Sequence, residues 1–145
     1  MNINKFTIKS QEALQQAQQI AQSFGQQQLE NEHIFKGILE VDENVTPFIL
    51  KKLNVNVELF KKVLDSTIQS FPKVSGSDLM FSRSASSTLT EAEIIAKKMN
   101  DEYVSIEHLI LAIFKSKSKV SQILKDQSVT EKGLEAAIAE IRKGE

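Results

Sequence analysis

Two histidines, His33 and His108, are the residues whose type and spacing most suggest chemistry, because they lie 75 residues apart and each follows a glutamate, Glu32 or Glu107. Imidazole and carboxylate groups bind metal ions and transfer protons. A metal site needs a third and a fourth ligand, however, and these histidines stand at the starts of two different apolar segments. The sequence therefore predicts no metal site and no cofactor, and a histidine that packs and hydrogen-bonds within its own helical turn.

Other arrangements of catalytic residues are missing from the sequence. Glu32 and Glu107 would both fall in the first turn of a helix, where the helix dipole favours an anion, so they need no acid–base role. The hydroxyl-rich stretch 82–88 has no accompanying pattern of His and Asp, and the chain has no cysteine. The phosphate-binding pattern Gly-x-x-x-x-Gly-Lys-Ser/Thr is also absent. We therefore predict that this chain is not an enzyme.

The segments around the two histidines are copies of one another. Residues 29–39 (LENEHIFKGIL) correspond to residues 104–114 (VSIEHLILAIF) at an offset of 75, and from residue 49 onward the offset is 74. Self-similarity at a fixed offset indicates a duplicated structural unit. Further matches are Phe6 with Phe81, Leu14 with Leu89, and Ile20 with Ile95.

Each copy carries four segments in which apolar residues recur every three or four positions, as in an amphipathic helix. None shows the alternation that is typical of a strand. The predicted helices cover residues 6–24, 30–41, 46–53 and 56–68 in the first copy, and 85–99, 105–114, 120–125 and 130–141 in the second. The predicted fold class is all-α, with two pseudo-repeated four-helix units, eight helices in total, packed as one domain.

Residues at the predicted helix ends support the repeat. Gly25 and Asn100 hold matched positions after the first helix of each unit, and both tolerate the left-handed backbone that commonly ends a helix. Small polar residues mark helix starts by capping free backbone N–H groups. The predicted N-caps are Thr46 (followed by Pro47), Asn56, Ser105 and Thr130.

A stretch rich in Pro, Gly and Ser, residues 71–78, interrupts the helical pattern and indicates a linker. It sets the predicted boundaries: repeat one at about 4–70, a linker at 71–80, and repeat two at about 81–144. All three parts belong to a single predicted domain.

Composition narrows the choice of partners and compartment. With 18 Lys and Arg against 19 Asp and Glu, the net charge of −1 gives no broad field to attract nucleic acid. No apolar run approaches the roughly 20 residues that cross a bilayer, and the N-terminal residues lack the apolar core of a signal peptide. We expect a cytoplasmic protein that binds neither nucleic acid nor membranes, and an isolated domain that is monomeric.

The duplicated pattern resembles the Clp N-terminal domain, the double four-helix repeat at the front of Hsp100/Clp AAA+ unfoldases. The resemblance covers essentially the whole chain. It rests on the Phe6-Thr7 start, on the two Glu-His helix starts (32–34 and 107–110) and on the linker between the repeats. The linker residues 71–76 and the final residues 141–145 are most similar to the ClpB-type disaggregase branch.

The resemblance implies a substrate-binding domain that serves the hexamerising AAA+ modules of a longer parent chain. It would bind apolar segments of unfolded or aggregated polypeptides in a groove between the repeats. On that resemblance, Thr7, Asp101 and Glu107 correspond to polar substrate contacts and Ile95 to an apolar groove position. Glu91 and His108 occupy two further groove positions that are usually Leu in the family.

Simpler roles stay open for these residues. Thr7 is in a position to cap the first helix, Asp101 is an ordinary loop residue after a helix stop, and Glu107 stabilises its own first turn. A second function also stays open. The domain could instead dock a folded adaptor protein, as a regulatory domain of a ClpC- or ClpA-type protease unfoldase.

Overall fold

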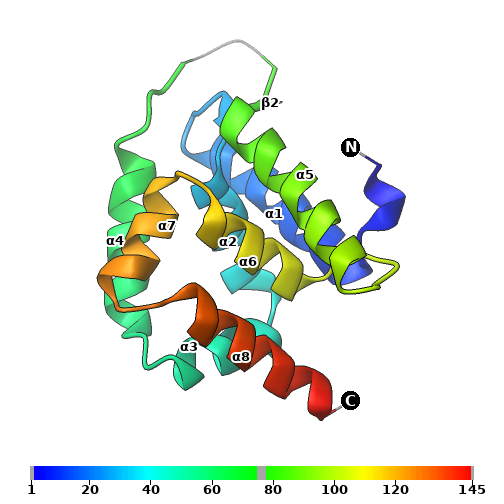
Figure 1. Ribbon diagram of the computed structural model, residues 1–145. Helices are drawn as coiled ribbons and strands as arrows, with labels where there is room; N and C mark the ends of the chain where they lie inside the picture. Colours follow the sequence, from blue (N-terminus) through cyan, green and yellow to red (C-terminus); the bar gives the residue numbers. More distant parts are fainter. Residues whose placement is uncertain (1, 75–77, 145) are drawn as a thin grey trace.

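The computed structural model describes residues 2–74 and 78–144, and in these ranges it is built almost entirely of helices (Figure 1). This confirms the predicted all-α class with two four-helix units. After a short 3-10 helix at Ile3–Lys5, the first unit contains α1 (Ile8–Ser23), α2 (Asn31–Val41), α3 (Val45–Lys52) and α4 (Val57–Gln69). The second contains α5 (Arg83–Lys98), α6 (Ile106–Lys115), α7 (Lys119–Asp126) and α8 (Glu131–Lys143).

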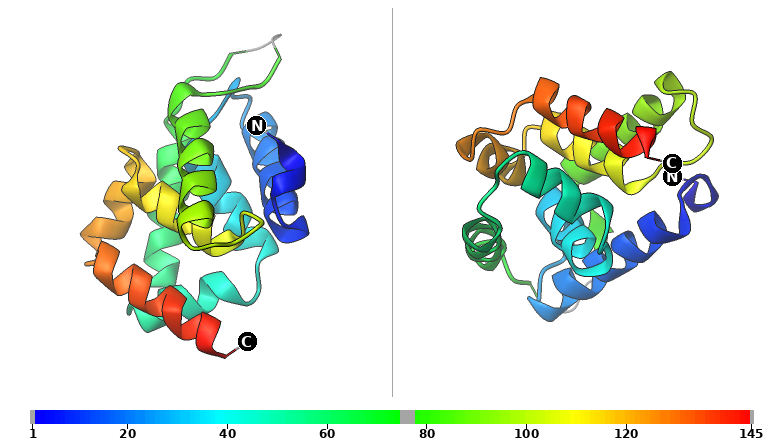
Figure 2. Two further views of the ribbon diagram at one scale, coloured as in Figure 1. Left: turned by 45° about the vertical axis from the view of Figure 1, so that its right-hand side comes forward. Right: turned by 90° about the horizontal axis from the view of Figure 1, so that it is seen from below.

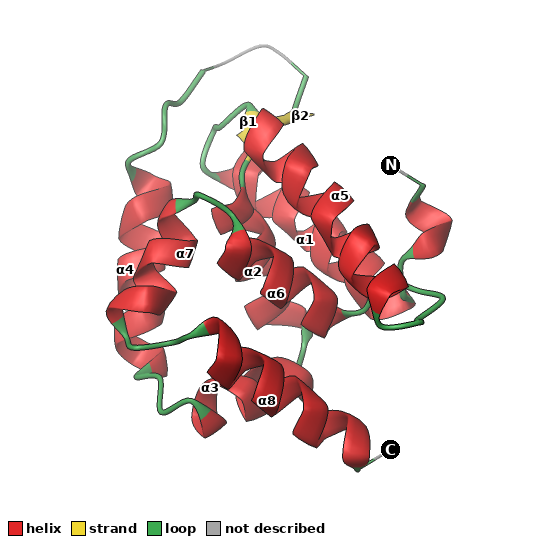
Figure 3. Ribbon diagram, in the orientation of Figure 1, coloured by secondary structure: helices red, strands yellow, loops and turns green. Residues whose placement is uncertain are grey.

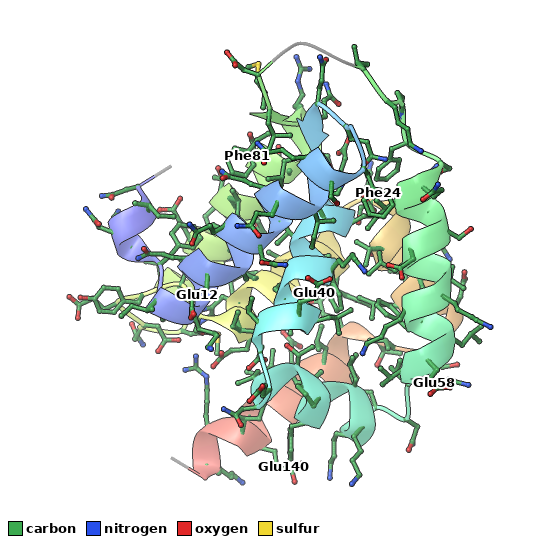
Figure 4. All side chains as sticks on the ribbon, turned by 180° about the vertical axis from the view of Figure 1, so that it is seen from behind. Glu12, Phe24, Glu40, Glu58, Phe81 and Glu140 are labelled. Atoms are coloured by element: carbon green, nitrogen blue, oxygen red, sulfur yellow. The ribbon has the colours of Figure 1, made fainter. Side chains whose placement is uncertain are left out.

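Helices α2 and α6 lie at the centre, where the two units share one hydrophobic core (Figures 1 and 2). Every residue of α6 except Lys115 is buried, because α6 packs against α5, α7 and α8 of its own unit and against α2 and α3 of the other. Helices α4 and α7 lie side by side at one edge. Seen from behind, acidic side chains such as Glu40 and Glu58 lie on the outside of the first unit (Figure 4). Because the two units share one hydrophobic core, they form a single domain.

A small parallel strand pair corrects the expectation that no strand is present (Figure 3). Strand β1 (Gln28–Leu29) pairs with β2 (Met80–Phe81), so that Leu29 lies opposite Phe81. Strands of two residues are too short for alternation to appear in the sequence.

The matched position in the other unit makes the same kind of pairing. Phe6 bridges to Val104 in parallel, Val104 N–H donates to the Lys5 carbonyl (2.8 Å), and Thr7 N–H donates to the Val104 carbonyl (3.0 Å). Phe6 corresponds to Phe81, and Val104 corresponds to Leu29. Each unit thus pairs the residues before its first long helix with the other unit, an exchange that resembles the contact across a two-fold axis.

The backbone confirms the predicted helix stops. Gly25 and Asn100 both have left-handed φ angles, of 70° and 60°. A second matched pair that the sequence did not indicate, Asn54 and Ser128, has φ angles of 58° and 68°. Four left-handed residues at repeat-related positions show that the two units share a backbone path although their residue types differ.

Most of the predicted helix starts are confirmed, but Thr46 is not an N-cap. The side chains of Asn56 and Thr130 accept hydrogen bonds from the N–H groups of Leu59 and Gly133, as caps do. Helix α3 begins at Val45, and Asp42 takes the capping role. The Asp42 carboxylate accepts bonds from the backbone N–H groups of residues 44, 45 and 46 and from the Thr46 hydroxyl. A carboxylate satisfies more orphan N–H groups than one hydroxyl can, which moves the helix start upstream.

The predicted linker is described only in part, because residues 75–77 lie outside the described residues. Of its described residues, Met80 belongs to β2. The boundaries at 4–70, 71–80 and 81–144 stay a prediction.

We predict that Gly37→Ala destabilises the domain by about 1–3 kcal/mol, as overpacking typically does. A Cβ at this position of α2 would lie 2.5 Å from the Ala13 carbonyl oxygen and 3.0 Å from the Ala17 nitrogen, so α1 and α2 would have to separate. Urea unfolding followed by circular dichroism measures the change. Gly144→Ala is the control, since its Cβ meets nothing closer than 3.5 Å. Equal midpoints for the two variants would contradict the close contact.

Candidate functional site

His33 is fully buried at the start of α2, and both of its ring nitrogens are hydrogen-bonded. Its Nδ1 accepts a bond from the Glu30 N–H (2.9 Å), so Nε2 carries the proton and donates to Gln26 Oε1 (2.6 Å). The Gln26 Nε2 in turn donates to the Ile68 carbonyl at the end of α4 (2.6 Å). Burial lowers the pKa of His33 to about 4, because charging an imidazole away from water is unfavourable. This histidine is a neutral structural group, in agreement with the predicted role.

His108 repeats this arrangement with charged partners. Its Nδ1 accepts from the Ser105 N–H (2.9 Å), and its Nε2 donates to Asp101 Oδ2 (2.8 Å). The Asp101 carboxylate also accepts hydrogen bonds from both terminal nitrogens of Arg142, at 3.1 and 2.6 Å. Arg142 Nη2 lies 3.3 Å from Glu107 Oε2. Asp101 stands where repeat one has Gln26, and Arg142 stands where it has Ile68. We name Asp101, Glu107, His108 and Arg142 the Arg142 cluster.

The Arg142 cluster ties together the α5–α6 loop, the first turn of α6 and the last turn of α8. The paired guanidinium, followed by the bond from His108, holds the pKa of Asp101 below its usual value, and Asp101 raises the pKa of Arg142. A two-point Arg–carboxylate contact fixes orientation as well as distance. The cluster is therefore an ionised version of the neutral contact that His33, Gln26 and Ile68 make in repeat one.

Glu32 and Glu107 occupy matched positions but have different partners. Glu32 is buried, and its Oε2 accepts a bond from the Val120 N–H (2.8 Å), so it caps the start of α7 in the other repeat. Burial raises the pKa of Glu32, and the bond from Val120 opposes that rise. By the repeat, Glu107 would cap the start of α3, but there Asp42 already accepts the hydrogen bond from the Thr46 N–H. Glu107 is thus available to Arg142.

An apolar pocket of about 580 Å³ lies beside the Arg142 cluster. Helices α5, α6 and α8 form it, and we name it the Ile95 pocket. Its apolar lining residues are Ile95, Met99, Leu111, Ile138 and Ala139, and its polar lining residues are Lys98, Lys115, Glu135, Arg142 and Lys143.

The Ile95 pocket does not lie between the repeats, and the expected client groove there stays a prediction. All its lining residues belong to repeat two, whereas the groove with Ile95 was expected between the repeats. At the centre of the junction, α2, α3, α6 and α7 pack closely and contribute to one continuous core. The pocket instead lies between α5, α6 and α8.

The structure brings together only some of the predicted site residues. Asp101, Glu107 and His108 meet around Arg142, and Ile95 lies in the floor of the adjoining pocket. Glu91 lines a neighbouring pocket of about 420 Å³ with several hydroxyl groups, and lies 3.5 Å from Lys115.

Thr7 makes a separate contact in repeat one. Its hydroxyl oxygen accepts a bond from the Ser10 N–H (3.1 Å) and caps α1. Substrate contact by Thr7, Ile95, Asp101, Glu107, Glu91 and His108 stays a prediction.

Sequence reasoning missed Arg142 as a functional candidate. A signal was present, because Arg142 is one of two arginines in the chain and falls on the apolar Ile68 of repeat one. When the matched residue of the other repeat is buried, a charged residue at that position is expected to pair with a carboxylate nearby.

The described ranges can be searched for metal-ligand groups and for membrane-spanning helices. Residues 2–74 and 78–144 contain no group of three or more His, Asp and Glu side chains placed to hold a metal ion. In the same ranges, no helix combines the length and the hydropathy that crossing a bilayer requires.

Comparison with known proteins decides the family. The Clp repeat (R) N-terminal domain matches residues 5–127 of the chain. The chain belongs to the Clp N-terminal domain family. All of it aligns, with 51% identity, to chaperone protein ClpB of Bacteroides thetaiotaomicron, and 99% of it aligns, with 42% identity, to chaperone protein ClpB of Porphyromonas gingivalis. In each case it spans only 17% of the relative's length.

The fold of this Clp N-terminal domain is also found in a solved structure. The crystal structure of the Hsp104 N-terminal domain from Candida albicans superimposes with a TM-score of 0.85, covering 97% of this chain and 93% of that one. The sequence identity is 18%, so this likeness concerns the fold alone. The two ClpB relatives place the chain as a ClpB-type N-domain of the Hsp100 family.

We predict that Asp101→Asn lowers the free energy of unfolding by about 1 kcal/mol at pH 7, because a partly exposed ion pair is lost. The folded-state pKa of Asp101 lies below the unfolded value near 3.9, so its contribution is present above pH 4 and disappears as the pH falls through the folded-state pKa. Urea unfolding at pH 7 and at a series of pH values below 4 should show the gap between the two proteins narrowing as the pH falls. The exposed Asp126→Asn serves as control. The absence of any gap at pH 7 would contradict the Arg142 cluster.

Proposed function

We propose that this domain captures apolar segments of unfolded or aggregated polypeptides and presents them to the ATPase ring of a ClpB-type disaggregase. The ring would be formed by parts of the parent protein outside this chain, and the domain itself would act without catalysis, in the cytoplasm. The observation that carries the proposal is the Ile95 pocket, an apolar cavity of about 580 Å³ that is open to solvent. The ClpB relatives, which are named chaperones, support it.

The chemistry of the pocket suits clients of no fixed sequence. Apolar burial is non-directional and scales with the area removed from water, so leucine, isoleucine or phenylalanine side chains of many proteins would be accepted. Ile95, Leu111 and Ile138 are themselves largely packed into the core, with 5%, 6% and 3% of their surface exposed. They offer only a shallow apolar floor. Weak binding follows, and it favours transfer of the client to a translocating ring.

The Arg142 cluster would support the pocket rather than compete for the client. Arg142 forms part of the pocket wall, while the carboxylates of Asp101 and Glu107 bind its guanidinium and His108 holds Asp101 in place. We propose that Asp101 and Glu107 act on the client mainly by fixing this wall. Thr7 would contribute through the stability of α1, which its side chain caps.

A folded adaptor protein is the second candidate partner, and a different surface favours it. Leu59 and Val63 lie one turn apart on α4, with 50% and 39% of their surface exposed. They are remote in sequence from every residue of the Ile95 pocket and could form a docking patch for a folded partner. If the client binds the Ile95 pocket and the adaptor binds the Leu59 and Val63 patch, the two partners would not compete.

We predict that Ala139→Glu weakens the binding of an unfolded, neutral apolar peptide on the order of tenfold, because the peptide would have to bury part of a carboxylate. Ala139 is exposed at the pocket, so the variant spares the core, whereas a charge at the buried Ile95 would also unfold the domain. Binding is measured by isothermal titration calorimetry, with a melting curve for each protein.

The matched control is Ala136→Glu, the same substitution on an exposed residue of α8 outside the pocket lining. It should bind like the unmodified domain. Equal weakening by both variants, or by neither, would refute the assignment of the Ile95 pocket as the client site.

A further inference from the structure

The charges around the Ile95 pocket are unequal. Four cationic side chains line it, Lys98, Lys115, Arg142 and Lys143, and Glu135 is the carboxylate among its described lining residues. The domain as a whole has a net charge of −1, so this excess of positive charge is local. Exposed charges act over about 10 Å at moderate salt, which is enough to reach a segment lying in the pocket.

Ion pairs compensate two of the four cations. Arg142 is held by Asp101 and Glu107, and Lys115 lies 3.5 Å from Glu91. The second pair is loose, since both side chains are about one third exposed, and such pairs contribute little. Lys98 and Lys143 form no ion pair within residues 2–74 and 78–144. They reach the pocket from two different helices, α5 and α8.

We propose that the Ile95 pocket selects apolar segments that carry an acidic side chain next to the apolar residue that enters it. The apolar side chain would rest on Ile95, Leu111 and Ile138, and the neighbouring carboxylate would meet Lys98 or Lys143. This inference rests on the proposed client site and adds the chemical class of the client. Segments flanked by lysine would be disfavoured, because they would place like charges together.

The test uses three peptides with the same apolar centre, flanked by two glutamates, two serines or two lysines, titrated calorimetrically into the domain at low salt. The glutamate peptide should bind roughly threefold to tenfold tighter than the lysine peptide, as expected for a few exposed charge pairs. The difference should shrink in about 1 M NaCl, where charges are screened within about 3 Å. Because the serine peptide has no flanking charge, its binding tests the proposed function separately from the charge selection.

Charge reversal identifies the residues responsible. The double variant Lys98→Glu with Lys143→Glu should prefer the lysine peptide. The control, Lys61→Glu with Lys62→Glu on the exposed face of α4, changes the net charge equally and should keep the glutamate preference.

The outcomes separate the two proposals. Equal binding of all three peptides by the unmodified domain would overturn the charge selection while leaving the proposed function in place. Failure of all three to bind would overturn both. A glutamate preference that survives the Lys98 and Lys143 reversal would overturn the assignment to this pocket.

Discussion

A neutral imidazole buried at the start of a helix needs a hydrogen-bond partner for each ring nitrogen, and both repeats are built around that requirement. The backbone N–H of the N-cap residue satisfies Nδ1 of His33 and of His108 in the same way. The partner of Nε2 differs, being Gln26 in one repeat and Asp101 in the other. With the change from Ile68 to Arg142 at the matched position of the fourth helix, this difference gives repeat two an ionised cluster where repeat one has a neutral contact.

The consequences extend to the fourth helix of each unit. Gln26 bonds the backbone of Ile68 and draws the end of α4 onto the core, whereas Asp101 bonds the side chain of Arg142 on α8. An arginine side chain spans a longer distance than a backbone carbonyl does, and the Ile95 pocket lies alongside it. The two repeats thus share one backbone framework, and residue differences at two matched positions give only repeat two the Arg142 cluster.

Much of the fold could be predicted from sequence because periodicity and helix stops are local. Gly25 and Asn100 stop their helices as expected, and the caps Asn56 and Thr130 follow from residue type. Long-range contacts could not be predicted in this way. The Asp42 cap of α3, the cross-repeat bond from Val120 to Glu32 and the pairing of Phe6 with Val104 depend on packing that one sequence does not reveal. The position of the Ile95 pocket within repeat two likewise required coordinates, whereas Arg142 left a signal in the sequence, a charged residue matched to the apolar Ile68.

We propose that clients bind in repeat two, in the pocket that the Arg142 cluster supports. Nuclear magnetic resonance of the ¹⁵N-labelled domain, titrated with an unfolded apolar polypeptide, tests it most directly. Amide shifts should concentrate on α5, α6 and α8 around Ile95, Leu111 and Ala139, with α4 and the matched face of repeat one unchanged. Shifts centred on α4, or spread equally over both repeats, would contradict it.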